Sequence, residues 1–170
     1  MIRLELIEEE DFNKVIEWNL DKTSDFLLQW AGESYKYPLT LEQIKEHYYN
    51  NIKNSVHDMY KIIWNDSNEI IGTVELAERD KENKIGRVSR FLIGDERYRG
   101  NGLGTEVLKK ITQIGFEKFS FDKITLGVFE HNIGAIKCYE KAGFKKQKLI
   151  EKAKKGSDGY WNLFEMEILR

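Results

Sequence analysis

The most informative stretch of the sequence is Phe91-Leu-Ile-Gly-Asp-Glu-Arg-Tyr-Arg-Gly-Asn-Gly-Leu-Gly-Thr105. An apolar run ends at Ile93, and three alternating glycines precede an apolar stripe of helical period that begins at Leu103. Glycine lets the backbone adopt positive φ and approach a ligand closely. Because a helix N-terminus offers unpaired amides and a positive dipole end, the stretch predicts a strand, a phosphate-binding loop and a helix.

Two other phosphate-binding motifs are excluded by their spacing. A dinucleotide-binding fingerprint needs G-x-G-x-x-G, but the third glycine position is Thr105 when counted from Gly100, and Val107 when counted from Gly102. A Walker loop needs Gly-Lys followed by Ser or Thr, and this tripeptide does not occur in the sequence. What remains is Arg-x-x-Gly-x-Gly beginning at Arg99, whose side chain can add direct charge neutralisation.

Composition narrows the class of protein. The 170 residues are 41% hydrophobic and 33% charged, with a net charge of −2, which suits one domain over residues 1–170. The charge balance provides no basic field for nucleic acid, and no apolar run approaches the roughly 20 residues that span a bilayer. Cys138 is the only cysteine, so a reducing compartment is the default. We therefore expect a cytoplasmic protein without nucleic-acid or membrane partners, for which a homodimer is one option.

Apolar periodicity and turn residues predict the remaining elements. Strands are expected at 2–7, 59–64, 69–77, 87–93, 124–129, 144–150 and 160–169. Helices are expected at 9–20, 41–52, 103–119 and 133–142, and the aromatic-rich segment 26–38 is expected to be irregular. This order predicts an α/β protein with a mixed sheet and helices on both faces.

A second block lies downstream of the loop. It reads Asn132-x-x-Ala-x-x-x-Tyr139-Glu-Lys-Ala-Gly-Phe144, and together with the loop it resembles the GNAT superfamily of N-acetyltransferases. Features similar to the branch that modifies ribosomal-protein N-termini, and to spermidine acetyltransferases, are Gly104-Thr-Glu106, Gly115-Phe116 and Gly159-Tyr160…Met166. The resemblance covers about 70–170. It implies a central, mostly antiparallel sheet flanked by helices, and direct transfer of the acetyl group of acetyl-CoA to a primary amine in a ternary complex.

The resemblance also implies how acetyl-CoA is bound. Its pyrophosphate would lie on Arg99, Gly100, Asn101, Gly102, Leu103, Gly104 and Thr105. The strand ending at Ile93 would pair with the pantetheine arm, and the amides of Leu92 and Ile93 would face the thioester oxygen, where one donor contributes about 3 kcal/mol. Asn132 is either the N-cap of the following helix, worth roughly 1 kcal/mol, or a pantetheine contact, and the two roles can coexist.

Two residues are candidates for proton transfer. Tyr139 can protonate the leaving thiolate, or it can simply extend the apolar face of the helix 133–142. Glu75 can take the amine proton, directly or through water, or it can be a solvent-facing glutamate. Cys138 points about 100° away from Tyr139 on that helix and is interpreted as a packing residue.

The acceptor site is expected in the part with the least resemblance to the family. Trp30, Glu33 and Tyr35 are candidate acceptor contacts, although the aromatic side chains can equally form a lid packed on the sheet. The three histidines, His47, His57 and His131, show no metal-ligand spacing, so no metal is expected. A protein N-terminus, a polyamine, an antibiotic amine and a free amino acid all remain open as acceptors. The alternative function is a non-catalytic acyl-CoA sensor or interaction module.

Overall fold

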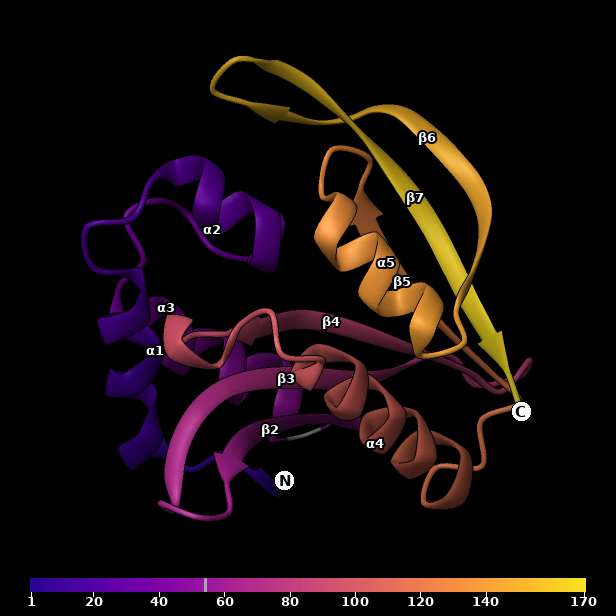
Figure 1. Cartoon of the computed structure of the whole chain (residues 1–170), viewed down its shortest axis with the longest axis horizontal. Helices are drawn as coiled ribbons and strands as arrows, with labels where there is room; N and C mark the ends of the chain where they lie inside the picture. Colours follow the sequence, from indigo (N-terminus) through magenta and orange to yellow (C-terminus); the bar gives the residue numbers. More distant parts are fainter. Residues whose placement is uncertain (54) are drawn as a thin grey trace. The chain divides into compact units, whose positions relative to one another are not determined.

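The computed structural model describes residues 1–53 and 55–170 (Figure 1). Within them, seven strands form one sheet in the order β1-β2-β3-β4-β5-β7-β6. The strands are β1 (Ile2–Leu6), β2 (His57–Trp64), β3 (Glu69–Asp80), β4 (Ile85–Ile93), β5 (Lys123–Phe129), β6 (Lys145–Gly156) and β7 (Gly159–Leu169). The helices are α1 (Phe12–Asn19), α2 (Ser24–Ala31), α3 (Leu41–His47), α4 (Leu103–Glu117) and α5 (Ile133–Lys141), with a π-turn at Tyr48–Ile52 and short 3-10 turns at Glu9–Asp11 and Glu96–Tyr98.

The strand pairings confirm the mixed, mostly antiparallel sheet. β1 pairs with β2, β2 with β3, β5 with β7 and β6 with β7, all antiparallel. β4 pairs with β5 in parallel, in a register that runs only from Ile85↔Lys123 to Arg87↔Thr125. The α/β fold expected from the sequence is therefore confirmed.

The chain divides into two compact units. The first unit consists of residues Met1–Ala77 and Ser89–Tyr98, and the second of Glu78–Val88 and Arg99–Arg170. The prediction of a single domain over residues 1–170 stays a prediction.

In the first unit, apolar faces of three helices bury a common core. Its members come from α1 (Phe12, Val15, Trp18), α2 (Leu27, Ala31), α3 (Ile44), β2 (Met59) and β4 (Leu92), among others. The expectation that 26–38 is irregular was wrong for its first part, because Thr23 caps α2 by accepting a hydrogen bond from the Phe26 amide. The residues of α2 that pack in this core, Phe26, Leu27, Trp30 and Ala31, lie on one face of the helix, so the helical spacing is present in the sequence.

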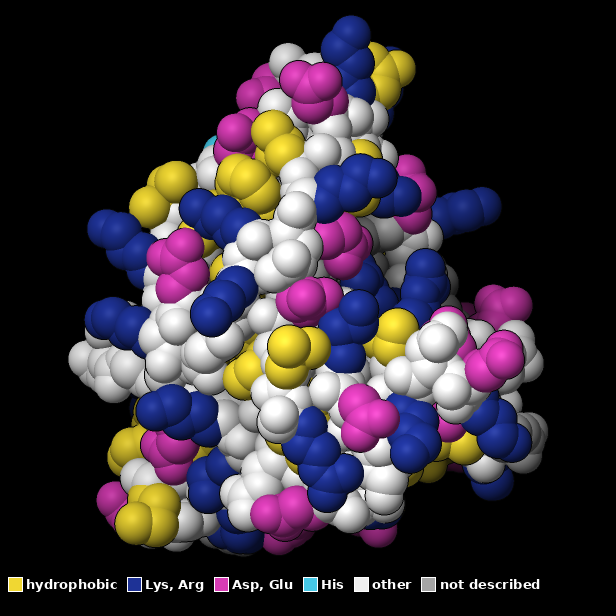
Figure 2. Space-filling model, turned by 90° about the vertical axis from the view of Figure 1, so that its right-hand side faces the viewer, with side chains coloured by type: hydrophobic (Ala, Val, Ile, Leu, Met, Phe, Trp, Pro, Cys, Tyr) yellow, Lys and Arg dark blue, Asp and Glu magenta, His cyan; other side chains and the backbone are white. Residues whose placement is uncertain are grey.

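In the second unit, α4 buries one face along its length, through Leu103, Val107, Leu108, Ile111, Thr112 and Gly115. The chain closes with the long antiparallel hairpin of β6 and β7 (Figure 1). On the face drawn in Figure 2, Lys and Arg side chains are interspersed with Asp and Glu. None of the helices among the described residues is both long enough and apolar enough to cross a bilayer.

Candidate functional site

The predicted phosphate loop lies in the second unit and depends on two left-handed glycines. Gly100 has φ +83° and Gly102 has φ +77°, and Gly102 is the N-cap residue of α4. A Cβ atom at either position would meet no heavy atom within 4 Å, so the backbone conformation, and not crowding within the chain, demands glycine here. The loop therefore presents an open backbone at the N-terminus of a 15-residue helix, the feature that binds phosphate groups.

The second sequence block supports the start of α5. Asn132 Oδ1 accepts a hydrogen bond from the Ala135 amide at 3.3 Å, which confirms its N-cap role. The Thr105 hydroxyl donates to the Cys138 carbonyl at 3.3 Å and so ties the first turn of α4 to α5. Burial raises the pKa of the Cys138 thiol, which disfavours the reactive thiolate and agrees with a packing role. The Asn132 contact to pantetheine stays a prediction.

Tyr139 is half-buried on α5. Burial raises the pKa of its phenol well above the ordinary value, so the hydroxyl keeps its proton throughout the neutral range. A general acid must carry a proton before it can donate one, and Tyr139 meets this requirement. Its assignment as the acid stays a prediction.

In the first unit, the end of β4 is fixed against β3. The amides of Gly94 and Asp95 both donate to the Ile71 carbonyl, at 2.9 and 3.2 Å. A Cβ atom at Gly72 would lie 2.3 Å from the Leu92 carbonyl oxygen, so only glycine allows β3 to approach β4 this closely. Leu92 and Ile93, whose amides are predicted to face the thioester, therefore lie on a rigid strand end.

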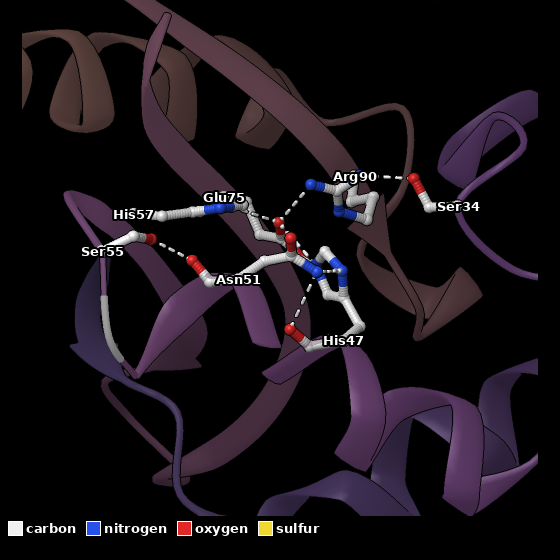
Figure 3. Close-up of polar contacts among 7 residues, drawn as sticks. All are labelled: Ser34, His47, Asn51, Ser55, His57, Glu75 and Arg90. Atoms are coloured by element: carbon white, nitrogen blue, oxygen red, sulfur yellow. Dashed lines mark hydrogen bonds and ion pairs between the residues drawn. The ribbon is translucent and has the colours of Figure 1, made fainter. Parts of the chain in front are cut away.

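Glu75, on β3, is the centre of a buried polar cluster in the first unit (Figure 3). Its carboxylate accepts hydrogen bonds from His47 Nε2 at 3.0 and 3.1 Å and from His57 Nε2 at 2.6 Å. Arg90 Nη2 lies 2.6 Å from Glu75 Oε2, and Arg90 Nη1 donates to the Ser34 hydroxyl at 2.5 Å. Against the burial that would raise it, these partners hold the pKa of the Glu75 carboxyl well below its ordinary range.

The carboxylate fixes the tautomer of both histidines. An ionised carboxylate only accepts hydrogen bonds, so each Nε2 that contacts Glu75 must carry a hydrogen. His47 completes the pattern, because its Nδ1 accepts a hydrogen bond from Asn51 Nδ2 at 3.2 Å. The cluster is therefore one carboxylate, one guanidinium and two imidazoles that present Nε2–H to it.

Three further polar atoms belong to the same neighbourhood. Among the described residues, Tyr35 Oη, Thr73 Oγ1 and Arg90 Nε are the buried side-chain polar atoms without a hydrogen-bond partner. The Tyr35 ring packs edge-on against the His47 ring at 5.5 Å, and Thr73 precedes Glu75 by two positions on β3. Buried polar groups in native proteins are nearly always satisfied, so these three atoms are candidates for hydrogen bonds to a polar ligand.

The cluster corrects one sequence-based expectation and sharpens another. Glu75 has no exposed side-chain surface, so the alternative of a solvent-facing glutamate is wrong. His47 and His57 come together with Glu75 despite their lack of motif spacing, and the nitrogen and carboxylate atoms of this group lie within 4.8 Å of one another. The role of Glu75 as the base stays a prediction, now with two histidines between the carboxylate and solvent.

Comparison with known proteins identifies the family. The family model described as "Acetyltransferase (GNAT) family" matches residues 24–144. The chain belongs to this family. The match includes the phosphate loop, the Asn132 block and the whole Glu75 cluster of this GNAT chain.

Several proteins of known name are similar to this chain. The spermine/spermidine N(1)-acetyltransferase of Bacillus subtilis (strain 168) is 48% identical over 69 residues, 39% of this chain and 45% of that protein, so the match spans less than half of the relative. An aminoglycoside N(6')-acetyltransferase type 1 of Klebsiella pneumoniae is 29% identical over 157 residues, 86% of this chain and 75% of that protein. The structure of a spermidine N-acetyltransferase from Vibrio cholerae in complex with CoA and spermine has a TM-score of 0.85 at 18% identity, covering 99% of this chain and 95% of that chain.

The three candidate acceptor residues of this GNAT chain differ in their surroundings. Trp30 Nε1 donates to Asn19 Oδ1 at 3.0 Å, and the half-buried ring packs on the first-unit core, as the packing alternative predicts. Tyr35 is buried beside the Glu75 cluster, whereas Glu33 is exposed. Acceptor binding by all three stays a prediction.

Proposed function

We propose that this protein is an acetyl-CoA-dependent N-acetyltransferase whose acceptor is a primary amine of a polyamine. Acetyl-CoA would bind through residues 99–105 and Asn132, and Leu92 and Ile93 would contact the thioester. Tyr139 would protonate the leaving thiolate. The acetyl group would pass directly to the amine while both substrates are bound in a ternary complex.

The observation that carries the proposal is the left-handed Gly100–Gly102 loop at the start of α4, in a chain of the GNAT family. A phosphate-bearing donor accounts for a loop that demands glycine while its Cβ positions remain open. The half-buried, protonated Tyr139 is a residue that a mere CoA sensor would not need.

The polyamine acceptor is supported by the relatives. Bacillus subtilis and Vibrio cholerae proteins similar to this chain are named for spermine or spermidine. The similarity to an aminoglycoside acetyltransferase supports an aminoglycoside, a second polycationic amine, as the alternative acceptor. A net charge of −2 is compatible with either cation.

The test is a thiol-release assay with acetyl-CoA and a panel containing spermidine, spermine, an aminoglycoside and a peptide with a free N-terminus. We expect the highest kcat/KM with the polyamines. Preference for the aminoglycoside or the peptide would overturn the acceptor while leaving the activity. CoA binding by calorimetry without turnover on any amine would instead establish the sensor.

The same panel can be run alongside a measurement of mass in solution. One structure similar to this chain, a spermidine N-acetyltransferase from Vibrio cholerae, is described as dodecameric. We therefore expect this protein to self-associate, and light scattering on the purified chain would show a single subunit if that expectation is wrong.

A further inference from the structure

We propose that His57 is the residue that takes the proton from the acceptor amine, and that Glu75 and His47 hold it in position for that step. The inference rests on the proposed amine acetylation and adds to it the identity of the base. It assigns a function to two histidines that no sequence motif marks.

His57 is more accessible than Glu75 within the cluster. The Glu75 side chain has 0% exposed surface, whereas that of His57 has 11%. A base must come within hydrogen-bond reach of the proton that it removes, or within reach of one intervening water. Glu75 cannot meet a substrate from its buried position, but the imidazole bound to it can.

The Nδ1 atoms of the two histidines differ in their hydrogen bonding. His57 Nε2 donates to Glu75 at 2.6 Å, so the lone pair of the neutral ring is on Nδ1. His47 has the same tautomer, but its Nδ1 already accepts a hydrogen bond from Asn51. A carboxylate that holds one imidazole nitrogen while the other takes a proton follows the logic of a serine-protease triad. This assigns proton acceptance to His57 and a positioning role to His47.

The charge balance of the cluster favours binding of a proton over binding of a metal ion. Arg90 already neutralises Glu75 through the 2.6 Å contact, so the cluster has no net charge when both imidazoles are neutral. A proton adds one positive charge that Glu75 stabilises directly. A divalent cation between His47, His57 and Glu75 would add two charges next to a guanidinium in a buried site, which is far more costly.

One residue of the cluster lies on the same strand as the predicted reaction centre. Arg90 lies on β4 two residues before Leu92, whose amide is predicted to face the thioester oxygen. Arg90 has φ +43°, a strained conformation for a residue other than glycine, of the kind that gathers at functional sites. The buried hydroxyl of Tyr35, whose ring packs against His47, has no hydrogen-bond partner and is suited to bind an amine or a water that relays its proton.

The proposed step balances as follows. The acceptor ammonium gives one proton to His57 Nδ1 and becomes a neutral amine. The amine nitrogen then forms the new C–N bond to the thioester carbon, and the C–S bond breaks with its electron pair leaving on sulfur. The nitrogen loses a second proton to solvent, Tyr139 protonates the thiolate and is reprotonated by solvent, and the imidazolium of His57 returns its proton to solvent.

The test is the pH dependence of kcat/KM for His57→Gln with the polyamine that the wild type prefers. We expect at least a roughly 10²-fold loss near pH 7, because general bases contribute 10²–10⁴-fold. The loss should shrink as the pH approaches about 10, the range in which alkyl amines lose their proton without help. A pH-independent loss, or unchanged kcat/KM, would overturn the proposal.

Controls separate this role from a structural one. His47→Gln should reduce kcat/KM less than His57→Gln, and His131→Gln, which changes a histidine of the second unit, should keep the wild-type pH profile. CoA affinity and thermal midpoint measured on each variant identify a folding defect, and in that case His57→Asn replaces His57→Gln. Equal effects of the His47 and His57 variants would overturn the assignment.

Failure of the base assignment can be distinguished from failure of the proposed function. A wild-type chain that acetylates no amine refutes the acetyltransferase itself. If the wild type turns over only after addition of Zn²⁺, and elemental analysis shows that His57→Gln loses the bound zinc, the cluster is a metal site and the base assignment is wrong.

Discussion

The phosphate loop of the second unit and the Glu75 cluster of the first are built in opposite ways. The loop takes its properties from seven consecutive residues, Arg99–Thr105, and two of its glycines have left-handed backbones. The Glu75 cluster draws on α3, β2, β3 and β4, and its hydrogen bonds join residues 28 and 18 positions apart. A site formed by consecutive residues can be recognised as a motif in the sequence, whereas a site assembled by tertiary structure cannot.

Gly102→Val tests the phosphate loop and should have the largest effect. A β-branched residue at φ +77° is strained by about 1–2 kcal/mol, and its side chain would project into the open space where the pyrophosphate is proposed to bind. We expect CoA affinity measured by calorimetry to fall by about 10²-fold or more. Gly159→Val, at a glycine of φ +134° in the β6–β7 turn, is the control and should affect stability but not CoA affinity. Retained CoA affinity in Gly102→Val would contradict the loop assignment.

Tyr139→Phe tests whether Tyr139, which belongs to the second sequence block, is the general acid. Loss of the hydroxyl should lower kcat by about 10²-fold while CoA affinity stays near the wild-type value. The pKa of Tyr139 is raised by burial, so the wild-type acid remains protonated and its contribution should persist to high pH. Tyr160→Phe, at an exposed tyrosine, should leave kcat unchanged. Unaltered kcat in Tyr139→Phe, with chemistry shown to limit the rate, would remove Tyr139 from the mechanism.

Local signals predicted most of the fold for the same reason that they predicted the loop. Asn132 caps α5 as predicted, and Thr40 before α3 and Gly143 after α5, at φ +105°, are also local caps, because caps and turns depend on neighbouring residues. The helix α2 was missed although Phe26, Leu27, Trp30 and Ala31 have helical spacing, because its eight residues provide only about two turns of that pattern.

The position of His57 beside Glu75 could not be predicted because the register of β2 and β3 shifts along the hairpin. Trp64 pairs with Glu69 next to the turn, and an irregularity between Ile62 and Ile63 then moves the pairing by one residue. Met59 therefore lies opposite Glu75, and His57 shares the Met59 face. Without the shift, Asp58 would oppose Glu75 and His57 would point to the other side of the sheet.

The two units also contain comparable ion pairs, and their removal should have unequal costs. Glu75 is fully buried against Arg90, whereas Glu165 and Arg87 form a two-bond pair at 2.9 and 3.0 Å with more than a quarter of each side chain exposed. Glu75→Gln should lower the free energy of unfolding by about 3 kcal/mol, because it leaves Arg90 buried without its counter-charge. Glu165→Gln should cost under about 1 kcal/mol. Denaturant melts at pH 7 would measure both.

The stability difference between wild type and Glu75→Gln should depend on pH in one direction. The pKa of Glu75 is lowered in the folded state, so its stabilisation is complete above the unfolded-state pKa of about 4.3 and is lost as the pH falls below that value. The difference between wild type and Glu75→Gln should therefore shrink as the pH falls toward 3. Equal costs for the two glutamate variants at pH 7 would show that burial does not distinguish the pairs.

The smallest expected effect concerns Trp30, which decides how far the acceptor region extends. Its Nε1–H donates to Asn19 and its ring packs on the first-unit core, so Trp30→Phe should cost about 1 kcal/mol in stability through the lost hydrogen bond. If Trp30 only packs, KM for the polyamine should not change. Glu33→Gln is the complementary variant, because an exposed carboxylate that attracts a cation should raise KM without lowering the thermal midpoint. A raised KM in Trp30→Phe with Glu33→Gln unaffected would reverse the two assignments and extend the acceptor site from the Glu75 cluster along α2.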